Sequence, residues 1–164
     1  MAIPVYSVVA YSGTGKTTLL EKLVPELKSR GLRVAVIKHD AHKFDIDHEG
    51  KDSWRMTRAG ADVTIIASSE KSAFMENRYV PFETLVERVT DVDVILTEGY
   101  KTGNYPKIAL RRAATGNDFA AEPDACFAVM SDAEVETTAN ALKLDDAAGL
   151  ADLIVTDIKK HISF

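Results

Sequence analysis

Continuous apolar runs alternate with amphipathic stretches along this chain. A strand buried on both faces gives a short apolar run rich in β-branched residues, bounded by turn residues. Such runs predict strands at residues 3–10, 33–38, 63–67, 92–97, 107–110 and 126–130, and residues 71–80 are candidates to extend the third of them into a hairpin. The chain is therefore expected to build a sheet that is covered on both faces.

Apolar residues that recur every three or four positions predict helices, because that spacing places them on one face. The first such stretch carries Leu19, Leu23 and Leu27 and predicts a helix over residues 17–30. Further helices are expected over residues 51–59, 81–89 and 146–161. Strands that alternate with helices in this way predict an α/β fold, a mostly parallel sheet flanked by helices.

Length and composition agree with this fold. The 164 residues are expected to form a single domain over residues 1–164. Hydrophobic residues make up 46% and charged residues 27%, as in a globular protein with a sizeable core. The net charge of -5 disfavours a broad nucleic-acid surface, because such surfaces normally have a basic bias.

Cysteine content and hydropathy favour a soluble, cytoplasmic protein. The single cysteine, Cys126, excludes a disulfide within the chain and lies in an apolar run, where a buried thiol is expected. No apolar run approaches the ~18 residues of a membrane span. The N-terminal residues also lack the basic segment of a signal peptide. We therefore expect neither nucleic acid nor membrane as a partner.

A glycine-rich turn joins the first predicted strand to the first predicted helix. Residues 10–17 read Ala-Tyr-Ser-Gly-Thr-Gly-Lys-Thr and match the phosphate-binding (Walker A) pattern G-x-x-x-x-G-K-[ST] except at Ala10. Gly13 and Gly15 permit the backbone angles that turn successive N–H groups toward an anion. Lys16 adds a charge suited to the terminal phosphates, and the Thr17 hydroxyl suits Mg²⁺. The motif in this context predicts a nucleoside triphosphate site and a fold of the P-loop NTPase type.

Two carboxylates follow predicted strands at the edge where ligands bind in an open α/β sheet. Asp40 follows the strand at 33–38, and Glu98 follows the strand at 92–97. Each is a candidate to hold Mg²⁺ directly or through water, or to orient an attacking water; the alternative for each is a solvated loop carboxylate. The candidate metal ligands are thus Thr17, Asp40 and Glu98, and the candidate catalytic residues are Lys16 and Glu98.

Residues 38–53 form a loop that holds three of the four histidines. Zinc would accept His39, His42 and His48 in principle, but the spacing matches no common zinc pattern and no cysteine is near. A second interpretation is a polar loop that caps the sheet. A third is an anion site beside the nucleotide, with donors at Lys38, His39, His42, Lys51 and Arg55.

Two adjacent arginines, Arg111 and Arg112, follow the predicted strand at 107–110. Neighbouring residues of a strand point to opposite faces, so at most one of the two can reach the nucleotide. Both are expected to be surface residues.

Three segments together resemble the MobB family, the molybdopterin-guanine dinucleotide biosynthesis adaptors. The first is the phosphate loop with the Thr-Leu-Leu that follows it. The second contains the Lys-His-Asp at 38–40, His42 and the Gly-Lys-Asp-Ser at 50–53. The third is the Thr-Glu-Gly-Tyr-Lys at 97–101. The phosphate loop is shared by many families, whereas the combination is much more specific. The resemblance extends over residues 3–107 and is looser in the C-terminal third.

The resemblance implies a GTP-binding homodimer with weak intrinsic GTPase activity. Its partner would be the MobA-like nucleotidyltransferase that attaches GMP to molybdopterin. The nucleotide-binding candidates in the loop are Ser12, Gly13, Thr14, Gly15, Lys16, Thr17 and Thr18. Carried over by position, Thr17, Asp40 and Glu98 are candidates for the Mg²⁺ site, and His39, His42, Lys51 and Lys101 line a neighbouring pocket. The chain has no Asn-Lys-x-Asp box, so a guanine preference rests on the resemblance alone.

The leading hypothesis is therefore a GTP-binding accessory protein of molybdenum cofactor biosynthesis with slow, Mg²⁺-dependent hydrolysis. Slow turnover fits a sequence without an obvious arginine finger, a residue worth roughly 10³–10⁵ in rate. The alternative is a small-molecule P-loop kinase, which would need the same loop and Mg²⁺ together with an acceptor pocket and a closing lid. A scaffold that no longer uses nucleotide is the third possibility.

Overall fold

A computed structural model describes residues 2–39 and 44–162 of the chain. The chain divides into two compact units. The first contains the segments up to His39 and from Val89 onward, and the second is the segment between them. That the two units behave as a single domain stays a prediction.

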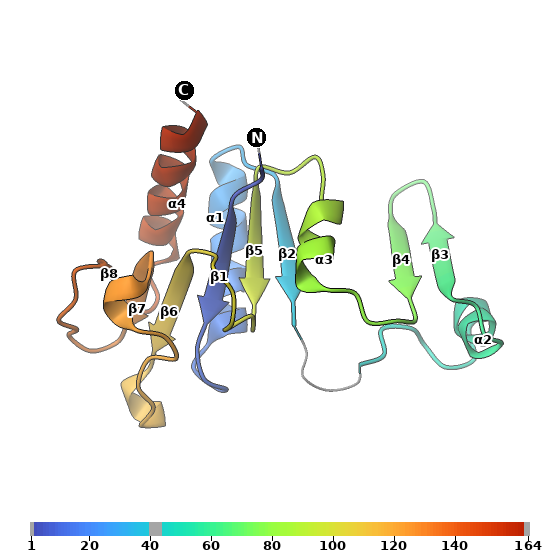
Figure 1. Ribbon diagram of the computed structural model, residues 1–164, viewed down its shortest axis with the longest axis horizontal. Coiled ribbons are helices and arrows are strands. Elements are labelled where there is room, and N and C mark those ends of the chain that lie inside the picture. The colour runs from blue at the N-terminus through green and yellow to red at the C-terminus, as the bar shows by residue number, and fades with distance from the viewer. Residues whose placement is uncertain (1, 40–43, 163–164) are drawn as a thin grey trace. The chain divides into compact units, whose positions relative to one another are not determined.

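The first unit is built on a six-stranded sheet with the order β2-β5-β1-β6-β7-β8. The strands are β1 (Val5–Val9), β2 (Val34–Lys38), β5 (Val94–Glu98), β6 (Lys107–Arg111), β7 (Ala128–Ser131) and β8 (Asn140–Lys143). Each neighbouring pair is parallel. The carboxyl ends of the strands therefore meet at one edge of the sheet, toward which the arrows of β1, β2, β5 and β6 point in Figure 1. The predicted α/β fold with a mostly parallel sheet is confirmed.

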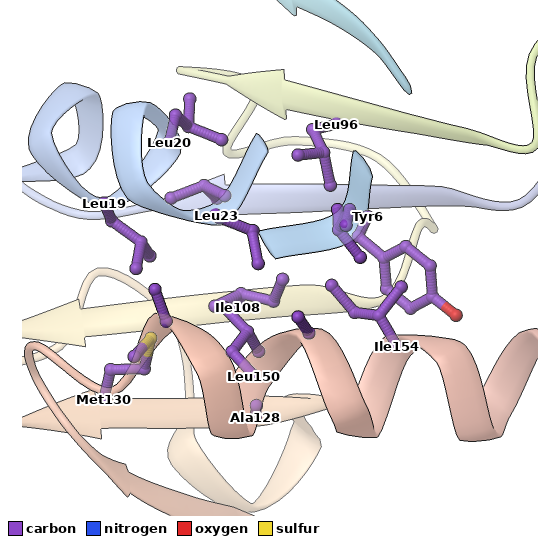
Figure 2. Packing of buried hydrophobic residues seen from close by; sticks show 14 of the residues in the cluster. Tyr6, Leu19, Leu20, Leu23, Leu96, Ile108, Ala128, Met130, Leu150 and Ile154 are labelled. Carbon is purple, nitrogen blue, oxygen red and sulfur yellow. The ribbon is translucent and has the colours of Figure 1, made fainter. Parts of the chain in front are cut away.

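Two long helices, α1 (Lys16–Ser29) and α4 (Ala147–Ile162), pack on one face of this sheet. Figure 2 shows Leu23 of α1, Ile108 of β6 and Leu150 of α4 grouped in the space between these elements, and all three are completely buried. Each such side chain contributes about 1.5–3 kcal/mol to folding through burial. The leucine pattern that predicted the first helix is thus the pattern that joins the helix to the sheet.

Segments without long helices cover part of the opposite face. Val9, Ala109 and Val129 point to this side of the sheet and pack with Cys126 and Phe119, which precede β7. Two single turns of 3₁₀ helix, Ala113–Thr115 and Pro123–Ala125, interrupt these connections. Cys126 is buried, as expected, and burial raises the pKa of its thiol.

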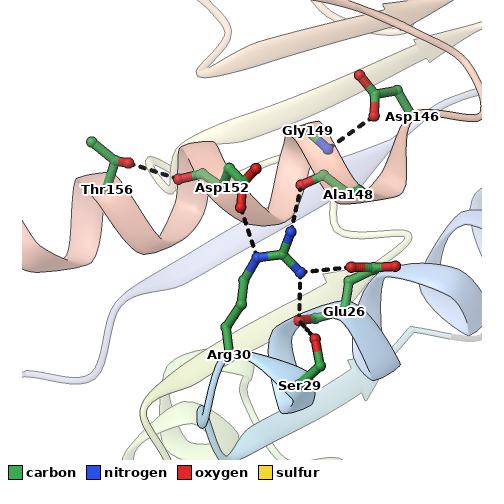
Figure 3. A network of polar contacts seen from close by, with 8 residues as sticks. All are labelled: Glu26, Ser29, Arg30, Asp146, Ala148, Gly149, Asp152 and Thr156. Carbon is green, nitrogen blue, oxygen red and sulfur yellow. Dashed lines mark hydrogen bonds and ion pairs between the residues drawn. The ribbon is translucent and has the colours of Figure 1, made fainter.

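A polar cluster ties the end of α1 to α4. Arg30, at the C-cap of α1, pairs with Glu26 Oε2 at 2.6 Å and with Asp152 Oδ1 of α4 at 2.7 Å. Its guanidinium also donates to the carbonyl of Ala148 at 3.2 Å. Figure 3 shows these contacts spreading from one side chain, together with a further hydrogen bond to the carbonyl of Glu26 at 2.8 Å. Because Asp152 is largely exposed, water screens this pair, and the ion pair adds little to the stability of the fold.

The second unit contains α2 (Asp52–Arg58), β3 (Val63–Ala67), β4 (Ser72–Glu76) and α3 (Phe82–Arg88). The strands β3 and β4 form an antiparallel hairpin that is a separate two-stranded sheet. The expected hairpin and the two short helices are thus present. Within the described residues, no helix has the length and apolar character to cross a membrane.

The strand β8 was not predicted from the sequence. Its four residues, Asn140–Lys143, include no β-branched or aromatic side chain, and it is one of the two edge strands of the sheet. An edge strand is covered on fewer sides and need not give the apolar run by which buried strands are recognised.

Candidate nucleotide-binding site

The glycine-rich turn leads from β1 directly into α1, as predicted. Gly15 is the N-cap of α1, and both Gly15 (φ 112°) and Gly13 (φ 77°) have positive φ values. A residue with a β-carbon adopts these angles only with strain. The two glycines allow the chain to reverse direction between the strand and the helix, so that backbone N–H groups of the turn and of the helix N-terminus lie at the same edge of the sheet.

Ala10, the departure from the phosphate-loop pattern, belongs to the hydrophobic core. It is only 1% exposed and packs in the cluster that includes Leu23 and Leu150. A methyl group at this position therefore fills space between the sheet and the helices. This explains how the loop accepts alanine at its first position.

Lys16 is held inside the loop to which it belongs. Its Nζ donates to the carbonyl oxygens of Ala10 at 3.1 Å and Tyr11 at 3.2 Å. Burial lowers the pKa of Lys16, the charge of Glu98 opposes that shift, and the charge of Lys101 adds to it. The ammonium group thus lies among one negative and one positive neighbour, in a place where a bound anion would interact with it strongly.

Thr17 and Glu98, two of the three predicted metal ligands, contact one another. The Thr17 hydroxyl donates to Glu98 Oε1 at 2.9 Å. Glu98 is the last residue of β5, where it pairs with Val8 of β1 and Lys38 of β2, and it is only 9% exposed. Oxygen donors of this kind suit Mg²⁺. The parallel register therefore brings together residues that are 81 positions apart in the chain.

The other predicted metal ligand, Asp40, lies outside the described residues, as does His42 of the neighbouring pocket. Among residues 2–39 and 44–162, no group of three or more histidine, cysteine, aspartate or glutamate side chains is placed to hold a metal ion. The metal role of Asp40 and the zinc interpretation of the histidine-rich loop stay predictions.

Gly99 allows a close approach of backbone at the end of β5. Its φ is 94°, and a β-carbon at this position would lie 3.0 Å from the carbonyl oxygen of His39. The N–H of His39 in turn donates to the carbonyl of Glu98 at 2.8 Å. The space that this glycine leaves is therefore taken by the chain that leaves β2.

His39 and Lys101, predicted to line the neighbouring pocket, lie at this edge of the sheet. The imidazole of His39 packs against the ring of Tyr100, with 4.9 Å between the ring centroids. Lys101 Nζ lies 4.6 Å from the ring centroid of Tyr11, which belongs to the phosphate loop. Lys51, the third described member of this predicted set, is the N-cap of α2 in the second unit, and its role in the pocket stays a prediction.

The remaining loop residues differ in their surroundings. Ser12 is exposed, whereas Thr14 is 2% exposed. Thr18 follows in the first turn of α1 and is exposed on the side of a cavity of about 640 Å³. The polar side chains predicted in the loop thus do not all face the same way.

Arg112 contacts the phosphate loop, a role that was not predicted from the sequence. Its Nε donates to the carbonyl oxygen of Thr14 at 3.2 Å, and a β-carbon at Gly15 would lie 3.3 Å from its Nη2. Arg111 lies instead near Asp118, with 3.9 Å between Nε and Oδ1. The expectation that at most one of the two reaches the site agrees with this geometry, and Arg112, which is partly exposed, is the one that contacts the loop.

Comparison with known families agrees with this arrangement of residues. The family model MobB, described as "Molybdopterin guanine dinucleotide synthesis protein B", matches residues 5–132, from the start of β1 to just past the end of β7. The chain belongs to the MobB family. The match covers the whole phosphate loop and both strands that place Glu98 and His39.

Two curated relatives align with nearly the whole chain. The molybdopterin-guanine dinucleotide biosynthesis adapter protein of Haemophilus influenzae is 39% identical over 93% of this chain and 88% of its own length. The protein of the same description from Escherichia coli is 38% identical over 97% of this chain and 95% of its own length.

Solved MobB structures share the fold. A crystal structure described as molybdopterin-guanine biosynthesis protein B superposes with a TM-score of 0.71 at 28% identity, and covers 94% of this chain and 99% of its own. Bacillus subtilis MobB gives a TM-score of 0.76 at 26% identity, with 94% and 97% of the two chains covered. The P-loop NTPase type of α/β fold inferred from the sequence is thus the fold of this family.

The backbone contact at Gly99 generates a prediction about stability. Gly99→Ala should lower the free energy of unfolding by about 2–3 kcal/mol, because the new methyl group meets the carbonyl of His39 and the backbone angle is strained. Urea denaturation followed by circular dichroism measures the change.

Gly116→Ala is the matched control, because Gly116 also has a positive φ (68°) but a β-carbon added there would have nothing within 4 Å. It should cost only about 1 kcal/mol, the strain of the left-handed backbone alone. Equal losses in the two variants would contradict the importance of the close approach.

Proposed function

We propose that this MobB-family protein binds GTP with Mg²⁺ and serves as an adapter in the formation of molybdopterin guanine dinucleotide. The observation that carries the nucleotide part is the hydrogen bond of 2.9 Å between Thr17 and Glu98 directly after the phosphate loop. It joins a hydroxyl at the helix N-terminus to a buried carboxylate at the end of a neighbouring strand. A hydroxyl and a carboxylate are the oxygen ligands that suit a Mg²⁺ ion bound to phosphates.

The loop supplies the positive side of the proposed site. Backbone N–H groups at the N-terminus of α1 favour anionic oxygen, and Lys16 lies beside them. When a triphosphate binds, the ammonium group of Lys16 would exchange the carbonyls of Ala10 and Tyr11 for phosphate oxygens. Lys101, over the ring of Tyr11, adds a second positive charge close to the loop.

The proposed hydrolysis is slow. Lys16 would stabilise charge on the terminal phosphates, and Glu98 would hold Mg²⁺ or orient water through it. Glu98 already accepts a hydrogen bond from Thr17, which favours a role in metal binding over that of a free base. Weak turnover is compatible with an adapter, whose task is binding.

The nucleotide part of the proposal predicts that GTP with Mg²⁺ binds to the purified protein in a calorimetric titration. Lys16→Ala should weaken binding about 100-fold or more, because a charge beside the phosphates is lost. Glu98→Gln should lower the affinity for Mg²⁺ by about 10–100-fold, as is usual when a group that supports a bound metal is changed. Lys28→Ala, in the last turn of the same helix, is the control and should bind as the wild type does.

Two results would contradict this part. Binding by Lys16→Ala that equals the wild type would remove the loop from the site. Transfer of labelled γ-phosphate from GTP or ATP to a small acceptor would favour the kinase hypothesis over the adapter.

The adapter part of the proposal is supported by the family. The relatives from Haemophilus influenzae and Escherichia coli are both described as adapter proteins of molybdopterin-guanine dinucleotide biosynthesis, and they align with almost the whole of this chain. An adapter needs a partner that performs the chemistry. The proposed partner is the nucleotidyltransferase that joins GMP to molybdopterin.

Affinity capture tests this part. The immobilised protein should retain the purified nucleotidyltransferase when GTP and Mg²⁺ are present, and Lys16→Ala reports whether nucleotide is needed for the contact. Failure of the wild-type protein to retain the enzyme both with and without GTP would remove the adapter role, whatever the outcome of the calorimetry.

We also propose that the protein is a homodimer, and the hairpin of the second unit supports this. Val63 and Ile65 of β3 and Phe74 of β4 share one face of the hairpin, where Ile65 and Phe74 are paired across the strands. They are 42%, 60% and 62% exposed. A two-stranded sheet is marginal by itself, and an apolar face of this kind usually indicates contact with another surface.

The homodimer proposal predicts a mass of twice the chain in light scattering after gel filtration. Ile65→Asp should shift the protein toward the monomer, because it places a charge on the apolar face. Ala73→Asp introduces the same charge on the opposite face of the hairpin and should leave the dimer intact. A monomeric wild type, or the same mass for both variants, would contradict the proposed interface.

A further inference from the structure

A cavity of about 640 Å³ lies beside the phosphate loop, at the carboxyl ends of β7 and β8. Its volume falls within the range of about 300–1,000 Å³ that is usual for small-molecule sites. Gly15 and Thr18 form part of the wall on the side of α1, while Ser131 and Lys143, the last residues of β7 and β8, form part of the opposite wall. We call this space the β7–β8 cavity.

Strand order places the β7–β8 cavity and the proposed Mg²⁺ site on opposite sides of the loop. β5, which ends in Glu98, is the neighbour of β1 on one side. β6 is the neighbour on the other side, and β7 and β8 follow it. A nucleotide whose terminal phosphates lie near Thr17 and Glu98 would therefore direct its nucleoside part toward β7 and β8.

Arg112 lies at the junction of the loop and the cavity. It lines the cavity, and its Nε–H donates to Thr14 in the loop. Its Nη2 faces Gly15, which leaves the planar guanidinium against the turn. Guanidinium groups stack favourably on aromatic rings and neutralise phosphates, so Arg112 is suited to the part of a nucleotide where base and phosphates meet.

The interior wall of the cavity is partly apolar, which suits the face of a flat ring. Leu19 of α1, Val129 of β7 and Leu142 of β8 contribute to it. Polar groups lie at the strand ends, where they would meet the edge of such a ring. This combination of an apolar wall and a few placed polar groups is typical of small-molecule sites.

Asp132 follows β7 directly and lines the cavity. Asp132 is exposed, and the backbone N–H of Ala113 donates to its Oδ1 at 2.7 Å, a contact that favours one orientation of the carboxylate. An ionised carboxylate only accepts hydrogen bonds. Guanine presents two adjacent donors, N1–H and the 2-amino group, whereas the corresponding edge of adenine presents an acceptor at N1. A carboxylate that faces this edge therefore complements guanine and repels adenine.

We propose that the β7–β8 cavity holds the base of the bound nucleotide and that Asp132 selects guanine by accepting hydrogen bonds from N1–H and the 2-amino group. This inference rests on the proposed binding of nucleotide by the phosphate loop. Asp132 would then recognise guanine in a chain that has no Asn-Lys-x-Asp box.

The test compares the affinities of GTP, ATP, ITP and XTP, each with Mg²⁺, for the wild type and for Asp132→Asn. The wild type should bind GTP best, and ITP about tenfold more weakly, because hypoxanthine lacks the 2-amino donor. In Asp132→Asn, the amide offers one acceptor and one donor, which match N1–H and the 2-oxo group of xanthine. GTP affinity should fall about 10–100-fold and XTP affinity should rise by a similar factor.

Asp145→Asn is the matched control, since Asp145 also lines the cavity and the change removes the same charge. It should leave the order GTP, ITP, ATP, XTP unchanged. A gain of XTP binding by Asp132→Asn alone supports the proposal, and this gain also shows that the variant is folded.

Several outcomes overturn the proposal while leaving the phosphate site intact. They are equal binding of GTP, ITP and ATP by the wild type, a folded Asp132→Asn that does not gain XTP affinity, and an exchange of preference produced by Asp145→Asn instead. Absence of any triphosphate binding by the wild type is a different result, because it would refute the proposed function itself. The wild-type comparison of GTP with ITP needs no variant and keeps the test decisive if Asp132→Asn does not fold.

Discussion

The parallel pairing of β1 with β5 is the constraint on which the candidate site depends. It places Val8 beside Glu98, so that the strand bearing the carboxylate ends level with the strand that leads into the phosphate loop. The loop must then reverse direction within a few residues to begin α1, which requires the positive φ values of Gly13 and Gly15. With both conditions met, the first turn of α1 brings Thr17 within hydrogen-bond distance of Glu98. Neither residue could reach the other from its own segment alone.

The two faces of the sheet contribute differently to this arrangement. On one face, α1 and α4 bury a continuous apolar core and are held at their ends by Arg30. The Tyr6 hydroxyl of β1 also donates to Asp157 Oδ2 of α4 at 2.6 Å. Burial raises the pKa of Tyr6, and the hydrogen bond to this carboxylate raises it further. On the other face, the coverage near β6 and β7 comes from non-helical connections. The helical layer thus packs directly behind the phosphate loop, whereas loops and 3₁₀ turns cover the other face near β6 and β7.

Much of the fold could be predicted from local patterns, because the buried strands and the leucine face of α1 obey simple periodicities. The phosphate loop was recognisable for a similar reason, since its glycines, lysine and threonine stand at fixed spacing in one short segment. What could not be predicted depends on the order of strands. Because side chains alternate along a strand, only one of Arg111 and Arg112 can face the loop. Which of them does so follows from the position of β6 beside β1, which the sequence does not show. The close approach at Gly99 was hidden for the same reason: its neighbour, His39, follows β2, a strand distant in sequence.

The distribution of charge explains why such a site suits an anion. Burial lowers the pKa of Lys16, the charge of Glu98 opposes this shift, and the smaller effect of the Lys101 charge adds to it. Glu98 is itself buried and accepts a hydrogen bond from the Thr17 hydroxyl. Burial of the charged Lys16 side chain is therefore the main unfavourable effect, and a ligand that brings negative charge would compensate it. A phosphate group near the two lysines would remove their repulsion, and Mg²⁺ near Glu98 would balance the charge that the phosphates bring. Relief of this desolvation would therefore contribute part of the affinity for the metal-bound triphosphate that we propose as the ligand.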